Sequence, residues 1–287
     1  LDTASIASFS ATQIAALTTA QVVGMESNQI AALSVASVRA LTTAQIDALS
    51  SVDVGAMTSA QIGALNSAQL RALGTVDVQG ISSADMAALG TAGVAALTSA
   101  QLGALTSDQI QGLSSTQVAG LSTTQVGQLG TAQVAALETA DLAAMSTLQI
   151  AAIKTAGIAA LGDASIAALT TAQAAALSTA QVRAIATSAI DALEVADIQA
   201  LRTAQIAALS GTQSAALSTD NLAALSTAQI RAMSTAAVDA LTAGQIEALA
   251  PSQVAAMSSG QLAALDTITA TQLAALSTAQ VATLGAA

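Results

Sequence analysis

Hydroxyl side chains are the most frequent groups in this sequence that could take part in chemistry. A Ser or Thr nucleophile needs an adjacent base to remove its proton, and the chain contains no His. The Ser and Thr residues also recur at fixed places in a short repeat, where each has an explanation as a helix cap. We therefore expect no catalytic residue and no enzymatic activity.

Three aspartates spaced by multiples of eight residues could be arranged as a calcium ladder: Asp53, Asp77 and Asp85. The same spacing also places an acid near the start of successive short helices, where the helix dipole favours negative charge. The glycine-rich nonapeptide of calcium-binding β-rolls is absent, as are glycine-rich phosphate loops. We therefore expect no metal site, no cofactor-binding residue and no cofactor.

The composition excludes several classes of partner. The chain has 17 acidic and 6 basic residues, a net charge of −11, no Trp or Tyr and one Phe. Nucleic acids need basic residues for the phosphates and aromatic residues for stacking, so we expect no nucleic-acid binding. The mean hydropathy of +0.67 would suit a membrane protein, but Ser, Thr or Gln interrupts every repeat and no run of about 18 apolar residues exists. We expect no membrane insertion.

The whole sequence is an array of an eight-residue repeat close to Leu-Ser-Thr-Ala-Gln-Val-Ala-Ala. With the large aliphatic residue at position 1, 33 octads run over 1–264 without a break. A three-residue insertion at 265–267 shifts the frame, two octads follow over 268–283, and 284–287 form a tail. No change of composition marks a boundary, so we predict a single domain over 1–287. Because the sequence begins and ends within the repeat, we expect a longer parent chain.

The octad predicts one short helix per repeat. A continuous helix advances about 800° in eight residues, so its apolar stripe would slip by about 80° per octad. Ser or Thr at position 2, followed three residues later by Gln at position 5, is the signature of a capping box. The apolar residues at positions 1 and 6 occupy the two places of a hydrophobic staple. Each octad should therefore begin a new helix at position 3.

Other residues agree with this register. Pro251, the one proline, falls on the first helical position, where proline is tolerated. Glycine replaces the cap at Gly74, Gly90, Gly130 and Gly162, which is an acceptable substitution. Most acids lie at positions 2 to 5, and Arg39, Arg71, Arg183 and Arg231 lie at position 7, as the helix dipole favours.

Helices of one to two turns are unstable alone, so we predict an all-α solenoid of short, stacked, capped helices. Positions 1 and 6, including the six Met residues, should form a Leu/Ile/Val core. Ala or Gly at positions 4 and 8 should let helices approach closely, and positions 5 and 7 should face solvent. Two octads per coil is the simplest arrangement. The alternative is a β-solenoid with Thr ladders, as in ice-binding proteins, against which the Ala content and the poor two-residue alternation argue.

The run Leu225-Ser-Thr-Ala-Gln-Ile-Arg-Ala and near-copies such as Leu177-Ser-Thr-Ala-Gln-Val-Arg-Ala resemble the octapeptide arrays of large bacterial secreted or cell-surface, adhesin-like proteins. The resemblance implies an extracellular bacterial setting. It favours a structural role as a filament, sheath or stalk component whose repeat number sets its length. The expected partners are further copies joined end to end, or flanking domains of the same polypeptide. The alternative is an α-solenoid module that binds protein or glycan, for which position 7 shows no block of distinctive residues.

Overall fold

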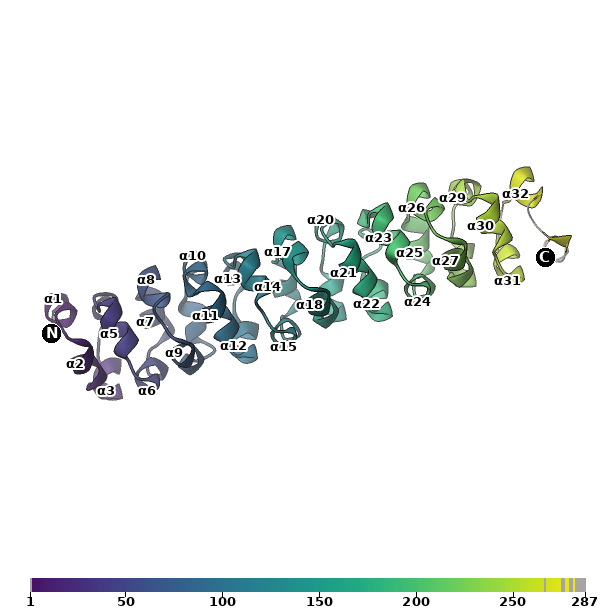
Figure 1. The fold of residues 1–287 in the computed structure, drawn as a ribbon. Coiled ribbons are helices and arrows are strands. Elements are labelled where there is room, and N and C mark those ends of the chain that lie inside the picture. Colours follow the sequence, from purple (N-terminus) through teal and green to yellow (C-terminus); the bar gives the residue numbers. More distant parts are fainter. Residues whose placement is uncertain (1, 266, 275–276, 279–280, 282–287) are drawn as a thin grey trace. The chain divides into compact units, whose positions relative to one another are not determined.

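The computed structural model describes residues 2–265, 267–274, 277–278 and 281. Helices account for 66% of the chain, and no strand occurs among the described residues. The prediction of an all-α solenoid is therefore confirmed, and the alternative of a β-solenoid is wrong. The chain divides into two compact units, Leu1–Met145 and Ser146–Ala287. Within each unit, short helices stack in successive layers (Figure 1).

The α-helices and 3-10 helices (η) of the first unit are α1 (Thr3–Ala7), α2 (Ala11–Ala15), α3 (Thr19–Val23), α4 (Ser27–Ala31), α5 (Val35–Ala40), α6 (Thr43–Asp47), α7 (Ser51–Ala56), α8 (Ser59–Ile62), α9 (Ser67–Ala72), η1 (Asp77–Gly80), α10 (Ser83–Met86), η2 (Ala87–Leu89), α11 (Gly90–Ala96), α12 (Ser99–Ala104), α13 (Ser107–Gln111), α14 (Ser115–Ala119), α15 (Thr123–Val126), α16 (Thr131–Ala135) and α17 (Thr139–Ala144).

Those of the second unit are α18 (Thr147–Ala152), α19 (Thr155–Ala159), α20 (Asp163–Ala167), α21 (Thr171–Ala176), α22 (Thr179–Ala184), η3 (Ile190–Ala192), α23 (Val195–Ala200), α24 (Thr203–Ala207), α25 (Gly211–Ala216), α26 (Thr219–Ala223), α27 (Thr227–Ala232), α28 (Thr235–Asp239), α29 (Ala243–Ala248), α30 (Pro251–Ala255), α31 (Ser259–Leu262) and α32 (Ala270–Ala274).

Each regular octad begins its helix where the capping box predicted. In α6, the Gln45 backbone N–H donates to Thr42 Oγ1 at 3.2 Å, and the Thr42 N–H donates to Gln45 Oε1 at 2.7 Å. Pro251 is the first residue of α30, and Gly130 and Gly162 stand at the N-caps of α16 and α20. The predicted start of the helix at position 3 is therefore confirmed in these octads.

Three octads complete one coil of the solenoid. In the first unit α6 packs against α9, and in the second α24 packs against α27. The helices of each pair begin three octads apart in the sequence. The expected two octads per coil is therefore wrong. With two octads per coil, each helix would pack against the helix two octads away in the sequence. In a three-sided coil, each helix packs against the helices three octads before and after it.

The core differs from the prediction at two repeat positions. Positions 1 and 6 are buried as expected; Leu201 is 3% exposed and Ile206 is 0% exposed. Position 5 was expected to face solvent, but Gln205 is also 0% exposed. Position 4 was expected to lie between close helices, but Ala204 is exposed, while Ala208 at position 8 is half-buried. A three-sided coil turns the 5–6 edge of each helix inward, which leaves the 3–4 edge in solvent.

Two octads without a capping side chain depart from the α-helix, whereas those capped by Gly130 and Gly162 do not. Gly74 and Ala186 occupy position 2 of the octads that form η1 and η3. Neither residue has a side chain that can accept the N3 backbone N–H, and the chain there forms a turn followed by a 3-10 helix. Gly90, at position 2 of its octad, follows η2 directly and is the first residue of α11. Its φ is 63°, which only glycine adopts readily.

The three-residue insertion shortens the last described coil. Its residue Asp266, much of the final predicted octad and the tail lie outside the described residues. Gln272, at position 5 of the first octad after the insertion, is 2% exposed and donates to Ile246 O and Leu249 O. These carbonyls lie 26 and 23 residues before it, where 31 and 28 are usual. The offsets are five residues shorter than usual, so in this coil the three inserted residues take the place of one eight-residue repeat.

Close backbone approach between coils predicts a steric effect at Gly112. A Cβ atom added there would overlap Ser83 O, whereas one added at Gly103 would lie 3.6 Å from Gln128 O. We expect Gly112→Ala to lower the free energy of unfolding by about 1–3 kcal/mol, because the backbones must move apart. Gly103→Ala, within α12, should raise it by about 0.4–1 kcal/mol. Urea unfolding followed by circular dichroism measures both, and equal effects would contradict the steric explanation.

Candidate functional site

A recurrent polar contact joins successive coils through the glutamine at position 5. Gln45 Nε2 donates to Ile14 O at 2.9 Å and to Leu17 O at 2.7 Å, while its Oε1 accepts the Thr42 N–H. One side chain thus completes the cap of its own helix and binds two carbonyls of the preceding coil. The acceptors lie 31 and 28 residues earlier in the chain.

The same contact recurs in both units, and we call its members the glutamine ladder. The residues whose amide donates to the preceding coil include Gln45, Gln61, Gln69, Gln101, Gln109, Gln117, Gln125 and Gln133 in the first unit and Gln181, Gln205, Gln213, Gln229, Gln245, Gln253, Gln261 and Gln272 in the second.

The ladder solves a backbone problem created by very short helices. Each helix leaves its last carbonyls without intrahelical partners, and a buried polar group without a hydrogen bond is costly. The ladder amide supplies such a partner to the carbonyl at position 1. It is a second donor to the carbonyl at position 6, which also accepts the backbone N–H three residues later. Sequence reasoning identified the capping half of this contact and missed the half between coils. The available signal was that position 5 is Gln in most octads, whereas the solvated position 7 accepts many residue types.

The three aspartates considered as a calcium ladder are explained by hydrogen bonds or local packing. Asp53 accepts the Ser50 N–H at 3.0 Å and the Ser27 hydroxyl at 2.9 Å. Asp85 accepts the hydroxyl of Ser59 from the neighbouring coil, and the Asp77 carboxylate lies against the backbone of Gly74. In the described part of the chain, no group of three or more His, Cys, Asp or Glu could hold a metal ion.

Asp141 occupies a ladder position and is buried, at 2% exposed. Its Oδ2 accepts the Glu138 N–H at 3.0 Å, but an ionised carboxylate cannot donate to the carbonyls of Ile110 and Leu113 in the ladder register. Burial raises the pKa of the Asp141 carboxyl above its ordinary value of 3.8; the Glu138 N–H opposes this rise and the Glu138 charge adds to it. The folded chain therefore holds this proton more tightly than the unfolded chain.

The raised pKa gives a pH-dependent prediction for Asp141→Gln. Between the ordinary and the raised pKa the folded state binds more protons, so the contribution of Asp141 to stability falls as pH rises. The variant removes this loss and restores two donors. We expect it to unfold with a free energy about 1–3 kcal/mol higher at pH 7, with a smaller gain at pH 4. Asp47→Gln, at an exposed position 7, is the matched control; an equal gain there would contradict the explanation.

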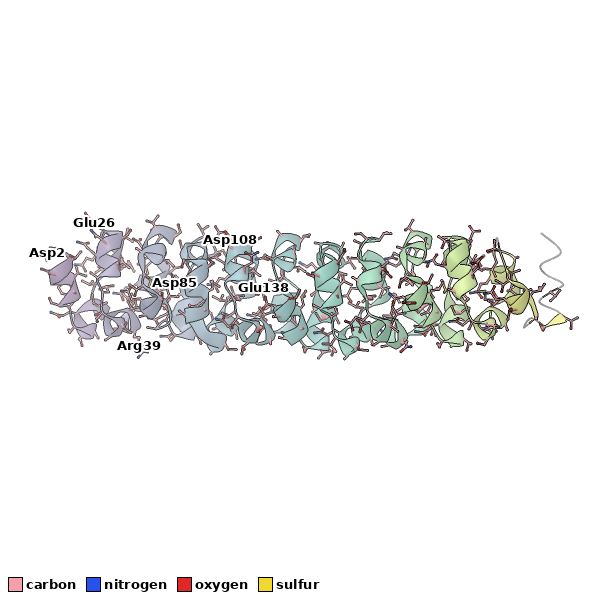
Figure 2. All side chains as sticks on the ribbon, turned by 90° about the horizontal axis from the view of Figure 1, so that it is seen from above. Asp2, Glu26, Arg39, Asp85, Asp108 and Glu138 are labelled. Atoms are coloured by element: carbon pink, nitrogen blue, oxygen red, sulfur yellow. The ribbon has the colours of Figure 1, made fainter. Side chains whose placement is uncertain are left out.

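Six charged residues of the first unit do not gather in one site. Figure 2 labels Asp2, Glu26, Arg39, Asp85, Asp108 and Glu138, which are spaced along the unit instead of gathering in one place. The hydroxyls at position 2 act as caps, as the sequence predicted, and those at position 3 lie mostly on the surface. None of the helices in the described part of the chain has the length and hydropathy needed to cross a membrane.

Comparison with known families identifies the family of the repeat. The model of the ALTTAQ repeat matches residues 22–59, 51–82, 78–115, 110–139, 134–171, 190–227 and 215–251, which is more than half of the chain. The chain belongs to the ALTTAQ repeat family. The family motif stands unaltered at 16–21, 40–45 and 168–173. In the structure its letters run from position 8 through the capping Thr to the ladder Gln, so the ALTTAQ motif spans the boundary between two helices. The comparison with curated proteins finds no match to this chain.

Proposed function

We propose that this ALTTAQ protein is a structural, non-catalytic spacer, a filament, sheath or stalk component on the outside of a bacterial cell. The observation that supports this proposal is the glutamine ladder, which joins coils at the same offsets in both units. The buried glutamine at position 5 binds each coil to the preceding one. Three added octads therefore form one more coil of the same kind. Repeat number then sets length.

The extracellular and bacterial setting rests on the resemblance to octapeptide arrays of secreted and cell-surface proteins. End-to-end association, or attachment to flanking domains, would transmit the length of the array to a larger structure. In the cells that make the protein, immunogold labelling should place it at the surface. Removing whole coils should shorten the labelled structure, and labelling confined to the cell interior would contradict the proposed setting.

The spacer role is tested by deletions that keep or break the repeat. Deleting 97–120, three octads of the first unit, should shorten the maximum dimension in solution scattering by about 8–10 Å, one helix layer. The helical circular dichroism should remain. Deleting only 109–120 removes one and a half octads and should reduce it sharply. A maximum dimension unaffected by the deletion of 97–120 would exclude a length-setting role.

A second candidate function is an α-solenoid binding module. The observation that favours it is a set of shallow surface grooves between successive coils, one of them lined by Arg71, Ala96 and Gly120 and another by Arg202, Ala200 and Ala224. Retention of one defined ligand at low micromolar affinity by the full chain would favour this role over the spacer.

A further inference from the structure

The backbone carbonyl at position 8 of the repeat accepts a hydrogen bond neither from the helix nor from the glutamine ladder. In the octad 41–48, the Ile46 carbonyl accepts the Leu49 N–H at 3.1 Å. In the ladder register, the carbonyls at positions 6 and 1 also accept a glutamine amide, as Ile30 O and Leu33 O do from Gln61. The position-8 carbonyl receives neither kind of donor. Every regular octad therefore ends in one acceptor that the helix and the ladder do not use.

Two side chains show what this acceptor binds. Arg71 Nε donates to Ala96 O at 3.0 Å, and Gln79 Nε2 donates to Ala104 O at 2.7 Å. Both donors stand at position 7 and reach a position-8 carbonyl 25 residues later, in the next coil. In the regular octads that the structure describes, these are the only donors of the chain on a position-8 carbonyl.

The geometry that lets Arg71 reach its carbonyl recurs in other coils. A Cβ atom built on Gly55 or Gly103, both at position 7, would lie 3.1 Å from Gly80 O or 3.6 Å from Gln128 O. Most position-7 residues are Ala or Gly, which have no donor to offer. An Ala or Gly at position 7 therefore makes no side-chain hydrogen bond to the position-8 carbonyl of the next coil.

These carbonyls lie in residues that line the surface grooves. Ala96 and Gly120, at position 8 of successive coils, line one groove with Arg71, and Ala200 and Ala224 line another. Arg202, which lines the second groove, donates through Nη2 to Leu177 O, another helix-terminal carbonyl, at 3.2 Å. Each groove is thus lined by an arginine whose guanidinium group binds a helix-terminal carbonyl.

We propose that these grooves bind an arginine-bearing segment of a partner protein, whose guanidinium groups donate to the position-8 carbonyls of successive coils. Guanidinium offers several N–H donors and no acceptor, so it matches a row of acceptors. The helix C-terminus favours a cation, and the net charge of −11 attracts one. Coils repeat at about 8–10 Å, and three residues of an extended chain span about 10 Å. An Arg at every third residue would therefore follow the coils. This surface is independent of the spacer proposal.

The test gives two of these carbonyls an arginine donor from the chain itself. Ala175→Arg with Gln199→Arg places guanidinium groups at position 7 of α21 and α23, at the same offset from Ala200 and Ala224 that separates Arg71 from Ala96. Ala172→Arg with Ala196→Arg adds the same charge to the same two helices at the exposed position 4. Because the chain has no Cys, Thr203→Cys at the rim of the groove can carry a donor fluorophore in every version of the full chain. The probe is an (Arg-Gly-Gly)₄ peptide with a terminal quencher.

We expect quenching to report binding to the chain that carries only the label. We expect the position-7 pair to weaken peptide affinity at the labelled groove about tenfold, and the position-4 pair to weaken it less than about threefold. The position-7 arginines both add charge and occupy the carbonyls through charge-assisted hydrogen bonds, whereas the position-4 arginines add charge alone. Circular dichroism checks that both variants keep the fold. Equal weakening by the two pairs would assign the binding to net charge and overturn the proposal. Absence of quenching in the label-only chain at millimolar peptide would also overturn it.

Discussion

Replacing Gln101 by leucine is expected to lower the free energy of unfolding by about 3–5 kcal/mol, because the buried Leu73 carbonyl and the part-buried Thr98 N–H lose their partner. The Leu70 carbonyl loses one of its two donors and keeps the Leu73 N–H. Gln101 is 2% exposed; its Oε1 accepts the Thr98 N–H at 2.8 Å, and its Nε2 donates to Leu70 O and Leu73 O, both at 2.7 Å. Leucine keeps most of the volume and supplies neither donor nor acceptor. Chemical unfolding followed by far-ultraviolet circular dichroism measures the change.

A matched substitution separates the ladder from the general effect of losing an amide. Gln111 stands at position 7 of α13 and is exposed, so Gln111→Leu should change the free energy of unfolding by less than about 0.5 kcal/mol. Gln101→Glu retains the acceptor and loses the donor, and at neutral pH it should destabilise as strongly as leucine. If Gln101→Leu were as mild as Gln111→Leu, the ladder would not stabilise the coils.

Truncation of Leu222 is expected to cost about 2–5 kcal/mol, the range for removing a buried leucine side chain. Leu222 lies at position 6 of α26 and is 0% exposed. In most octads of the second unit this position holds a Leu, Ile or Val, with Ala174 and Ser214 as exceptions, and no aromatic side chain is present there to fill the space. Thermal and urea unfolding of Leu222→Ala would both show the loss.

The same chemical change can be made on the surface of the same unit. Leu148, at position 4 of α18, is 71% exposed. Leu148→Ala removes the same atoms without opening a cavity, and alanine has the best helix propensity. We expect its free energy of unfolding to stay within about 0.5 kcal/mol of the parent chain. A loss comparable to that of Leu222→Ala would show that position 4 is not the solvated edge described here.

The local structure was predictable because the signals that fix it lie within one octad. Thr42 and Gln45 are three residues apart, and their capping box needs no information from the rest of the chain. The coil was not predictable in the same way. Its three octads per turn follow from packing between helices that are distant in the sequence, and near-identical octads contain nothing that distinguishes one neighbour from another.

The glutamine ladder was half-predictable for the same reason. The Oε1 of Gln45 bonds within its octad, where sequence spacing shows the partner. Its Nε2 bonds to Ile14 and Leu17, which no pattern within the octad connects to it. Without the coil number, a polar side chain at position 5 was reasonably assigned to solvent. The exposure of Ala at position 4 was missed because it depends on the same inward turn of the 5–6 edge.

The repeated offsets of the ladder have a consequence for how such a gene can change. Loss or gain of a single octad shifts every later octad onto the next side of the coil, where it meets a neighbour of almost the same sequence. The bonds of Gln272 across a shortened coil show that the contacts re-form after such a change. Unequal recombination between copies of the DNA unit that encodes one octad would therefore yield folded proteins of graded size, so that lineages can differ in repeat number while keeping one architecture.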